Sequence, residues 1–467
     1  MKDQNYDIAV IGAGPAGEKA ALEASAAGAR VIIIEKGSQP GGASVITGTI
    51  PSKSLRETVK YVLSLAQQEI SGIEYSLNRR ISVKELMHRK DVVITQRVGD
   101  ILETYGRENI ECVFGEARFR SANELVIASP EKADRTIRAE KTIIAVGTIP
   151  YHPPDIRFDG KRILDSDTIL TLDRIPDTLA VYGGGVIGCE YASIFSLLGV
   201  KVQMIDPRGT LLSFIDQELS VMLAVILEQT GVHLLLGESY QKIEADGDRV
   251  RTLLQSGKTV ETTALLYANG RQGTADRLSL ENCGLKLNSR NQLDVNDNYQ
   301  TENPNIYAVG DVIGFPSLVS VSNEEGRLAA RHAIKGTRVN RVGGDIPYGI
   351  YTIPEIAMIG ATEQELIAGR VPYEKGTCYF KNLARGLIIG DRRGLLKLLY
   401  HSENRRVLGV HICGQSAAEL IHIGQAVMKL NGTIDYFLEN VFNFPTLSAA
   451  YKVAARNGLS KIEHRAD

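Results

Sequence analysis

The sequence predicts an α/β protein, because a strand, a glycine-rich turn, a helix and a second strand follow one another twice in the chain. The first occurrence covers residues 6–36 and reads YDIAVIGAGPAGEKAALEASAAGARVIIIEK. The second covers residues 179–206 and reads LAVYGGGVIGCEYASIFSLLGVKVQMID. Both place a GxGxxG run after a strand and an acidic residue at the end of the next strand. This is the layout of a Rossmann-like dinucleotide-binding domain.

The first copy supplies the residues Gly12, Gly14, Gly17 and Glu35. Gly12 permits the tight turn, Gly14 lets the backbone approach a pyrophosphate, and Gly17 lets the helix pack against the strand. The start of the helix offers N–H groups to phosphate, and Glu35 can accept hydrogen bonds from ribose hydroxyls. The alternative is a glycine-rich turn without a ligand, which the complete pattern disfavours.

The second copy repeats the device with Gly183, Gly185, Gly188 and Asp206. The acid stands 23 positions after the first glycine in both copies. One chain is therefore expected to hold two dinucleotides. Because cofactors carry the difficult redox chemistry, two such sites suggest two redox cofactors that exchange electrons.

The composition excludes several classes of function. A net charge of -2 gives no basic footprint for nucleic acid, and no apolar run approaches the ~18 residues of a membrane span. The first strand begins near Tyr6, so no targeting peptide is expected and the predicted location is the cytoplasm. The five cysteines are scattered and the eight histidines have no ligand spacing, so neither disulfides nor a metal site is predicted.

The order of motifs resembles the FAD-dependent pyridine nucleotide-disulfide oxidoreductases over essentially the whole chain. The resemblance is carried by TIIAVGTIP (142–150), LLYANGRQG (265–273), IYAVGDV (306–312) and GIYTIPEIAMIGATEQEL (349–366). Further segments, such as GTIPSKSLRE, GVIGCEYASIF and AAELIHIGQA, are most similar to the soluble pyridine nucleotide transhydrogenase branch. Members of that branch pass hydride between NAD(H) and NADP(H) through FAD.

The resemblance implies FAD in the first dinucleotide fold and NAD(H) or NADP(H) in the second. It assigns Gly147 and Asp311 to FAD, and Gly270 to the pyridine nucleotide. It also implies a homodimer formed through a C-terminal α+β domain. The expected domains are an FAD-binding domain in two segments, an inserted NAD(P)-binding domain and a dimerisation domain, at residues 1–150 with 269–345, 151–268, and 346–467 respectively.

Smaller features are expected outside these motifs. Lys84–Tyr105 is predicted to be a helix, and GLLKLLYHSENRRVLGVHIC (394–413) two strands around a polar turn. Apolar residues recur at helical spacing over residues 420–430. The polar C-terminal segment 460–467 is expected to be frayed.

The chain departs from the family at its thiol chemistry. Ser44 and Thr49 stand where the family has its two redox cysteines, and Phe444 and Ala449 where it has a histidine and a glutamate that serve the thiols. All four parts of the dithiol machinery are absent together. Reduction of a disulfide substrate by the usual route is therefore excluded, and only flavin and nicotinamide chemistry is expected.

Two residues are the candidate catalytic groups. In the family, the lysine matching Lys53 lies beside the flavin, where a fixed cation stabilises the charge of the reduced ring. The glutamate matching Glu190 pairs with that lysine; otherwise Glu190 would only favour its own helix dipole. Cys189 adjoins Glu190 and is expected to be an inert buried residue.

Asp206 also predicts a nucleotide preference. An acid at this position accepts a hydrogen bond from the 2′-hydroxyl of NAD and repels the 2′-phosphate of NADP. NADH is therefore expected to be the better reductant, while Arg208 permits weaker binding of NADP(H).

The function predicted from the sequence is hydride transfer between NAD(H) and NADP(H) through FAD. The alternatives are an NAD(P)H:quinone reductase or diaphorase, an NADH oxidase, and a non-catalytic sensor that binds FAD and nucleotide. Retention of Lys53 and Glu190 argues against the sensor. The remaining three differ only in the molecule that accepts electrons from the flavin.

Overall fold

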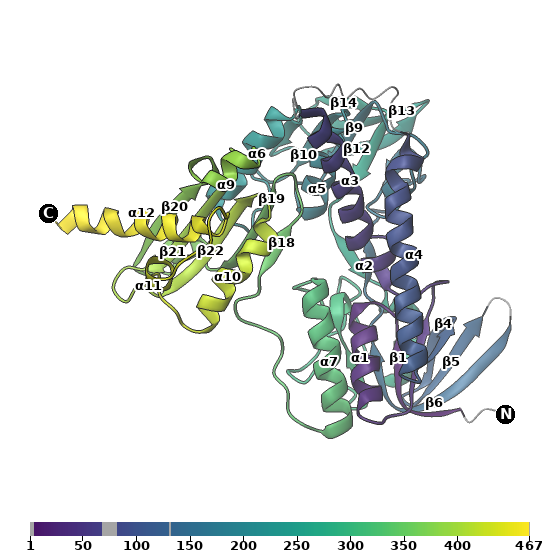
Figure 1. Cartoon of the computed structure of the whole chain (residues 1–467). Helices are drawn as coiled ribbons and strands as arrows, with labels where there is room; N and C mark the ends of the chain where they lie inside the picture. The colour runs from purple at the N-terminus through teal and green to yellow at the C-terminus, as the bar shows by residue number, and fades with distance from the viewer. Residues whose placement is uncertain (1–3, 68–81, 130–131, 467) are drawn as a thin grey trace. The chain divides into compact units, whose positions relative to one another are not determined.

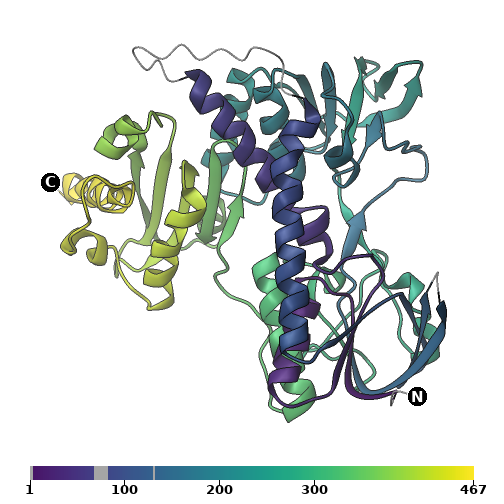
Figure 2. The same ribbon diagram turned by 45° about the vertical axis from the view of Figure 1, so that its right-hand side comes forward.

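The structure, a computed structural model, describes residues 4–67, 82–129 and 132–466. The chain divides into two compact units (Figures 1 and 2). The first combines Met1–Pro153, Asp165–Arg174 and Gly270–Val342, and the second combines Pro154–Leu164, Ile175–Asn269 and Gly343–Asp467. Each is described by itself below. Asp165–Arg174 packs with the first unit, as the hydrogen bond between His152 Nε2 and Asp165 Oδ2 (2.7 Å) illustrates.

The first unit is built on a sheet of seven described strands in the order β3-β2-β1-β6-β5-β4, with β17 paired to β6. Two strands pair with the same edge of the long strand β6. Its first half pairs antiparallel with β5, and its last residues pair parallel with β17. The strands are β1 (Asn5–Ile11), β2 (Val31–Glu35), β3 (Glu111–Phe114), β4 (Glu116–Ser121), β5 (Glu124–Ser129), β6 (Lys132–Ile144) and β17 (Ile306–Ala308).

Both faces of this sheet are buried. Successive residues of β1 enter two different hydrophobic clusters: Ile8 and Val10 join one, and Ala9 and Ile11 the other. Such continuous apolar strands are expected of a parallel sheet covered on both sides. The helices of the unit are α1 (Pro15–Ala26), α2 (Gly42–Ile46), α3 (Thr49–Gln67), α4 (Val83–Arg107) and α7 (Val319–Lys335). The helix predicted over Lys84–Tyr105 is thus confirmed as α4.

Helices α1 and α7 lie side by side in both ribbon views, although about 300 residues separate them in the chain (Figures 1 and 2). Gly326 of α7 makes this close approach possible, because a Cβ there would lie 2.0 Å from the carbonyl oxygen of Ala16. The contact fixes the N-terminal end of α1, which carries the first glycine motif.

The second unit contains a parallel sheet in the order β11-β10-β9-β15-β8. Its strands are β8 (Ile163–Leu164), β9 (Thr178–Tyr182), β10 (Lys201–Asp206), β11 (His233–Leu236) and β15 (Ala264–Tyr267), and its helices are α5 (Val186–Leu197) and α6 (Gln217–Gln229). A smaller antiparallel sheet consists of β12 (Tyr240–Asp246), β13 (Arg249–Leu254) and β14 (Thr259–Thr262).

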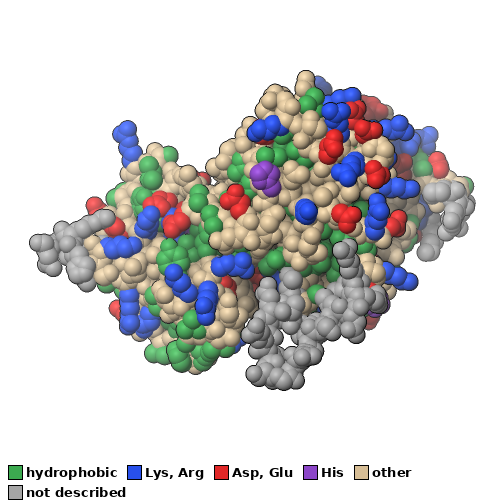
Figure 3. All heavy atoms as spheres, turned by 90° about the horizontal axis from the view of Figure 1, so that it is seen from above, with side chains coloured by type: hydrophobic (Ala, Val, Ile, Leu, Met, Phe, Trp, Pro, Cys, Tyr) green, Lys and Arg blue, Asp and Glu red, His purple; other side chains and the backbone are tan. Residues whose placement is uncertain are grey.

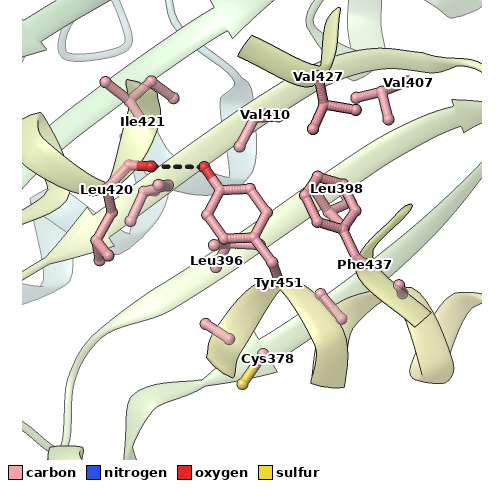
Figure 4. Close-up of a cluster of buried hydrophobic side chains, with 14 of the residues drawn as sticks. Cys378, Leu396, Leu398, Val407, Val410, Leu420, Ile421, Val427, Phe437 and Tyr451 are labelled. Atoms are coloured by element: carbon pink, nitrogen blue, oxygen red, sulfur yellow. Dashed lines mark hydrogen bonds between the residues drawn. The ribbon is translucent and has the colours of Figure 1, made fainter. Parts of the chain in front are cut away.

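The rest of the second unit is an antiparallel sheet in the order β18-β19-β22-β21-β20 with helices packed on it. Figure 4 shows part of its core, where the hydroxyl of Tyr451 donates to the carbonyl of Leu420 at 2.8 Å. The elements are β18 (Tyr348–Ile350), β19 (Glu355–Gly360), β20 (Tyr373–Tyr379), β21 (Leu395–His401), β22 (Val407–Gly414), α8 (Glu363–Ala368), α9 (Ala384–Ile388), α10 (Ala417–Lys429), α11 (Asp435–Glu439) and α12 (Ala449–Ala466).

Of the three predictions made for the C-terminal part of the chain, two are confirmed and one is wrong. The predicted strand pair is confirmed as β21 and β22, and the helical spacing after Leu420 as α10. The prediction of a frayed C-terminal tail over residues 460–467 is wrong, because helix α12 continues to Ala466. Residues 460–466 contain neither proline nor glycine, so nothing in the sequence stops the helix.

Candidate functional site

The first glycine motif forms the turn between β1 and α1. Gly12 has φ 104°, and a Cβ on it would lie 2.4 Å from the carbonyl oxygen of Ala145. A Cβ on Gly17 would lie 1.9 Å from the carbonyl oxygen of Gly12. The protein's own packing therefore requires glycine at both positions.

Gly14 differs, because neither its backbone nor its packing requires glycine. Its φ is −75°, and an added Cβ would meet only the Cα of Gly42, at 3.8 Å. Gly185, the equivalent in the second motif, has φ −81° and no atom within 4 Å of an added Cβ. Both residues cap the N-terminus of a helix without a side-chain hydrogen bond. The open space in front of them fits a pyrophosphate that approaches the helix start.

Glu35 ends β2 and is 8% exposed. Its Oε2 accepts from the N–H of Ala13 and its Oε1 from the N–H of Gly37, both at 2.8 Å. The carboxylate is thus fixed beside the glycine turn, where the ribose of a bound dinucleotide would lie.

The second motif repeats this geometry in the second unit. Gly183 has φ 118°, and a Cβ on it would lie 2.8 Å from the carbonyl oxygen of Ala268. A Cβ on Gly188 would lie 1.8 Å from the carbonyl oxygen of Gly183. Asp206 ends β10, is fully buried, and accepts from the backbone N–H of Gly184.

Asp206 has one partner that Glu35 lacks. The guanidinium of Arg208 donates from Nε to Oδ1 at 2.9 Å and from Nη2 to Oδ2 at 2.7 Å. Burial alone would raise the pKa of Asp206, but the hydrogen bonds from Arg208 and the backbone lower it. Asp206 is therefore stabilised in its charged form by a bidentate ion pair.

Gly147 and Asp311, predicted to contact FAD, lie in the first unit. Thr148, which follows Gly147, donates from its hydroxyl to Asp311 Oδ2 at 3.4 Å. Arg271 in turn donates from Nε to the Thr148 hydroxyl at 2.9 Å and from Nη2 to the Thr148 carbonyl at 2.8 Å. These contacts join the short strands β7 (Thr148–Pro150) and β16 (Arg271–Gly273).

Burial raises the pKa of Asp311, and it also raises the pKa of a neighbouring acid that lies in none of the sequence motifs. Glu325 of α7 is 5% exposed, and burial raises its pKa to about 7 although its Oε2 accepts from the N–H of Gly310 at 2.8 Å. Thr148 bonds Asp311 directly, while Arg271 bonds Thr148 and Glu325 bonds Gly310, the residue before Asp311. These three residues were missed because the contacts that join them are tertiary. No local pattern in the sequence marks such contacts.

Gly270, predicted to contact the pyridine nucleotide, has φ 108° and accepts from the N–H of Tyr151 at 3.1 Å. It is the first residue of the third segment of the first unit, whereas the second glycine motif belongs to the second unit. Its assignment to the pyridine nucleotide stays a prediction.

The candidate catalytic residues lie on helices. Lys53 stands in the second turn of α3, with its Nζ 3.5 Å from the hydroxyl of Ser52. Glu190 is buried in α5, and its Oε1 accepts from the backbone N–H of Tyr351 at 2.9 Å. Lys53 belongs to the first unit and Glu190 to the second, and the pairing between them stays a prediction.

Ser44 and Thr49 replace the redox cysteines, and neither side chain can form a disulfide. Ser44 lies in α2, where its hydroxyl donates to the carbonyl of Gly41 at 3.2 Å, and Thr49 begins α3. Cys189 is completely buried, and burial raises its pKa. A neutral, buried thiol is a poor nucleophile.

Two family models match the chain. The pyridine nucleotide-disulphide oxidoreductase model matches residues 6–326, and the model of the dimerisation domain of that family matches residues 346–455. The chain therefore belongs to the FAD-dependent pyridine nucleotide-disulphide oxidoreductases. The family uses FAD and NAD(P), which fits the two dinucleotide folds described above.

Among individual relatives, the chain is similar to proteins named soluble pyridine nucleotide transhydrogenase. Those of Shigella boydii serotype 18 and Escherichia coli O9:H4 are each 46% identical over 461 residues, which is 98% of this chain and 99% of the relative. The branch expected from the sequence is thus confirmed.

Solved structures give the same fold. The HOCl-induced flavoprotein disulfide reductase RclA of Escherichia coli, in its Cu(II) complex, aligns with a TM-score of 0.89 at 25% identity, over 98% of this chain and 99% of that one. LpdA of Mycobacterium tuberculosis aligns with a TM-score of 0.88 at 25% identity, over 96% and 98%. Within the described residues, no helix is long and apolar enough to cross a membrane.

Proposed function

We propose that the protein passes hydride between NAD(H) and NADP(H), with FAD in the first dinucleotide fold as the carrier. The observation that carries the proposal is the 46% identity, over nearly the full length, to relatives named soluble pyridine nucleotide transhydrogenase. The two dinucleotide folds and the loss of both redox cysteines support it, because transfer between nucleotides needs no dithiol.

The residues of the first fold fit FAD. Space lies open in front of Gly14, the carboxylate of Glu35 is held beside the turn, and Asp311 supplies a half-buried acceptor. When bound, FAD would take a hydride from one reduced nucleotide and give it to the oxidised form of another. Lys53 would hold a positive charge near the ring, which stabilises the added negative charge.

Residues of the second unit hold the side chain of Glu190 in place. The backbone N–H of Tyr351 holds one carboxylate oxygen of Glu190, and the helix around it is buried. In this proposal Glu190 orients the Lys53 ammonium group, so that the cation has a defined place when hydride arrives. The pyridine nucleotide occupies the second fold, at Gly183, Gly185 and Gly188.

We further propose that the protein is a cytoplasmic homodimer. The dimerisation-domain match at residues 346–455 supports the dimer. In the described part of the chain all five cysteines are unpaired, which fits a reducing compartment.

The test is an anaerobic double-mixing experiment. The holoenzyme is first reduced with NADH, and it is then mixed with thio-NADP⁺, with a soluble quinone, or with oxygen. We expect thio-NADP⁺ to reoxidise the flavin fastest. Faster reoxidation by the quinone or by oxygen would assign the protein to the quinone reductases or the oxidases instead.

A further inference from the structure

A loop of the second unit runs from the second dinucleotide fold to the C-terminal antiparallel sheet. It covers residues 207–215, between Asp206 at the end of β10 and Asp216 before α6. We propose that Lys397 and Gln364, which bind the far end of this loop, are positioning residues that keep the loop in the conformation needed to bind the pyridine nucleotide. The inference rests on the proposed function in one respect, the assignment of a pyridine nucleotide to the second fold.

The near part of the loop packs on the second glycine motif. Parallel α/β sheets bind ligands outside the carboxyl ends of their strands, and the loop leaves β10 at that end. The N–H of Leu212 donates to the carbonyl of Gly184 at 2.9 Å. A Cβ on Gly184 would lie 2.8 Å from Cδ2 of Leu211. Movement of the loop would therefore disturb the turn on which the pyrophosphate of the nucleotide would lie.

The loop contains a backbone conformation that is unfavourable for its residue. Leu212 has φ 46°, in the left-handed region, and its side chain is fully buried. A bulky residue stays in this region only where the surrounding structure holds it there. The loop therefore needs a fixed attachment on each side of Leu212. The bond to Gly184 supplies one, and residues after Leu212 must supply the other.

Asp216 supplies this second attachment, because its buried carboxylate joins three elements. Its Oδ1 accepts from the N–H of Glu218 in the first turn of α6, at 3.1 Å. Its Oδ2 accepts from the N–H of Glu363, the first residue of α8, also at 3.1 Å. Lys397 of β21 donates to both oxygens, at 2.9 and 3.1 Å. The end of the loop is thus fixed to α8 and to the C-terminal sheet.

Gln364 of α8 binds the residues on either side of Asp216. Its Nε2 donates to the carbonyl of Ile215, the last residue of the loop, at 2.7 Å. Its Oε1 accepts from the N–H of Gln217 at 3.3 Å. Three consecutive residues are therefore held from the C-terminal part of the second unit. We call Asp216, Lys397 and Gln364 the loop anchor.

The ion pair in the loop anchor is better suited to positioning than to stabilisation. Asp216 and Lys397 are both fully buried. The cost of taking two charges out of water offsets much of their attraction, so a buried ion pair gains little over apolar packing. Its directional bonds nevertheless fix the groups that it joins. Here they fix the end of a strained loop, where a defined position matters most.

Loss of the loop anchor should lower the fraction of molecules whose loop is ready to bind. The observed Kd is the intrinsic Kd divided by this fraction, so a fall to about one tenth would raise the Kd about tenfold. NAD⁺ and NADP⁺ should be affected to a similar extent, because the glycine turn binds the pyrophosphate that they share. The rate of flavin reduction at saturating NADH should not change, since the bound nucleotide restores the loop.

The test compares two variants of the loop anchor, Gln364→Ala and Lys397→Met, with the control Asn457→Ala. Asn457 of α12 is half-buried, as Gln364 is, and its Oδ1 accepts from the N–H of Thr377 of β20 at 3.0 Å. It therefore joins two elements within the C-terminal part of the chain, away from the loop.

Three measurements are made on the holoenzyme. Isothermal titration calorimetry gives the Kd of NAD⁺ and of NADP⁺ for the oxidised protein. Anaerobic stopped-flow absorbance gives the limiting rate of flavin reduction by NADH. Hydrogen exchange followed by mass spectrometry gives the protection of peptides that cover residues 207–216, and thermal unfolding gives the stability of each variant.

In Gln364→Ala we expect both Kd values to rise about 2- to 10-fold, which corresponds to the net contribution of one hydrogen bond. Lys397→Met should raise them about 10- to 100-fold, because its bonds are to charged groups. Residues 207–216 should exchange faster in both variants, while FAD content and the limiting rate stay unchanged. Asn457→Ala should lower the melting temperature without changing either Kd or the exchange of the loop.

Unchanged Kd values in Gln364→Ala, or an equal rise in Asn457→Ala, would overturn the inference and leave the proposed function intact. If Lys397→Met does not fold, the comparison of Gln364→Ala with Asn457→Ala decides. If the loop anchor controls nucleotide affinity but thio-NADP⁺ does not reoxidise the reduced flavin, the inference holds and the proposed function fails. A wild-type protein that binds neither NAD⁺ nor NADP⁺ would overturn both.

Discussion

Lys53 is a cation on a rigid element next to the segment that has lost its redox cysteines. It lies within the long helix α3, and its neighbour Ser52 is buried. A side chain that extends from a packed helix keeps a defined position more readily than one on a loop. If the charge of Lys53 stabilises the reduced flavin, its loss should lower the rate of hydride transfer to the flavin and leave the affinity for FAD unchanged.

Replacing Lys53 tests this role. Lys53→Met should slow reduction of the flavin by NADH on the order of ten- to a thousandfold, because it removes electrostatic stabilisation of the reduced ring. FAD content should stay unchanged. The measurement is anaerobic stopped-flow absorbance, with Lys53→Arg as a control that keeps the charge. An unchanged rate in Lys53→Met would show that the charge of Lys53 does not assist hydride transfer.

The cysteine thiols should be unreactive towards alkylating reagents in the folded protein. Burial raises the pKa of Cys112 and Cys283 to about 11 and the pKa of Cys378 and Cys413 to about 12. The thiolate fraction at pH 7 is therefore very small.

We expect iodoacetamide at pH 7 to leave turnover largely intact, and two-electron reduction to give no long-wavelength thiolate–flavin absorbance band. The urea-unfolded protein is the control and should react at all five cysteines. Rapid inactivation of the folded enzyme, or the appearance of the band, would show that a thiol takes part after all.

At the scale of elements, a buried ion cluster joins helices and strands of the second unit. Lys397 of β21 is fully buried and contacts Asp216 at 2.9 Å, Glu218 at 3.0 Å and Glu363 at 2.5 Å. Burial opposes ionisation of Glu363, but Lys397 and Lys375 bring its pKa down to about 2. The cluster connects the start of α6 with α8 and the C-terminal sheet.

Lys397→Met should destabilise the protein by about 3–5 kcal/mol, because it leaves a buried carboxylate without its cation. Lys375→Met is the control; its side chain is 43% exposed and its loss should cost at most about 1 kcal/mol. Urea denaturation at fixed protein concentration measures both.

The same cluster predicts a pH dependence. Because the folded-state pKa of Glu363 is depressed, its contribution is complete above the ordinary carboxyl pKa near 4 and is lost as the pH falls towards about 2. The difference between wild type and Lys397→Met should therefore shrink over this range. A difference that is constant from pH 6 to pH 2 would contradict the assignment.

The contact between α1 and α7 gives a second test at this scale. Gly326→Ala places a methyl group 2.0 Å from a backbone oxygen and should cost about 1–3 kcal/mol. Gly99→Ala is the control, since Gly99 lies in α4 with no atom within 4 Å of an added Cβ. That change should stabilise by up to about 1 kcal/mol. Thermal unfolding and release of FAD fluorescence report both, and equal melting temperatures for the two variants would refute the packing argument.

Features formed by consecutive residues could be predicted from the sequence, whereas contacts between distant elements could not. The glycine motifs were recognisable because each needs consecutive residues only: Gly12 and Gly17 are fixed by one turn and the helix that follows it. The partners of Asp311 were not recognisable, because Arg271 and Thr148 come from distant segments and meet only in the fold. Likewise, Arg208 was visible in the sequence, but its bidentate pairing with Asp206 was not.

At the scale of the whole molecule, the charges nearly balance, with a formal net charge of -2. On the face drawn in Figure 3, basic (blue) and acidic (red) side chains are intermixed. Large apolar side chains are nevertheless exposed in the dimerisation domain. Leu430 is 83% exposed, Val441 94% and Phe444 78%.

Exposed apolar side chains in a dimerisation domain are expected to be covered by a second copy. Val441→Asp and Phe444→Asp should therefore shift the protein from dimer to monomer in size-exclusion chromatography with light scattering. Val221→Asp, at a 55% exposed position on α6, is the matched control and should leave the mass unchanged. A wild-type monomer, or dimers in all three variants, would contradict the proposed interface.

The discontinuous first unit has a consequence for synthesis on the ribosome. The strand β17 and the helix α7 complete the sheet and cover α1, yet they are translated after residue 305, long after α1 itself. At about 5–20 residues per second, α1 waits roughly 15–60 s for the helix that covers it. During this interval its alanine-rich face is exposed, so a nascent chain stalled before Gly326 should be bound by chaperones, and release should follow once α7 has left the exit tunnel.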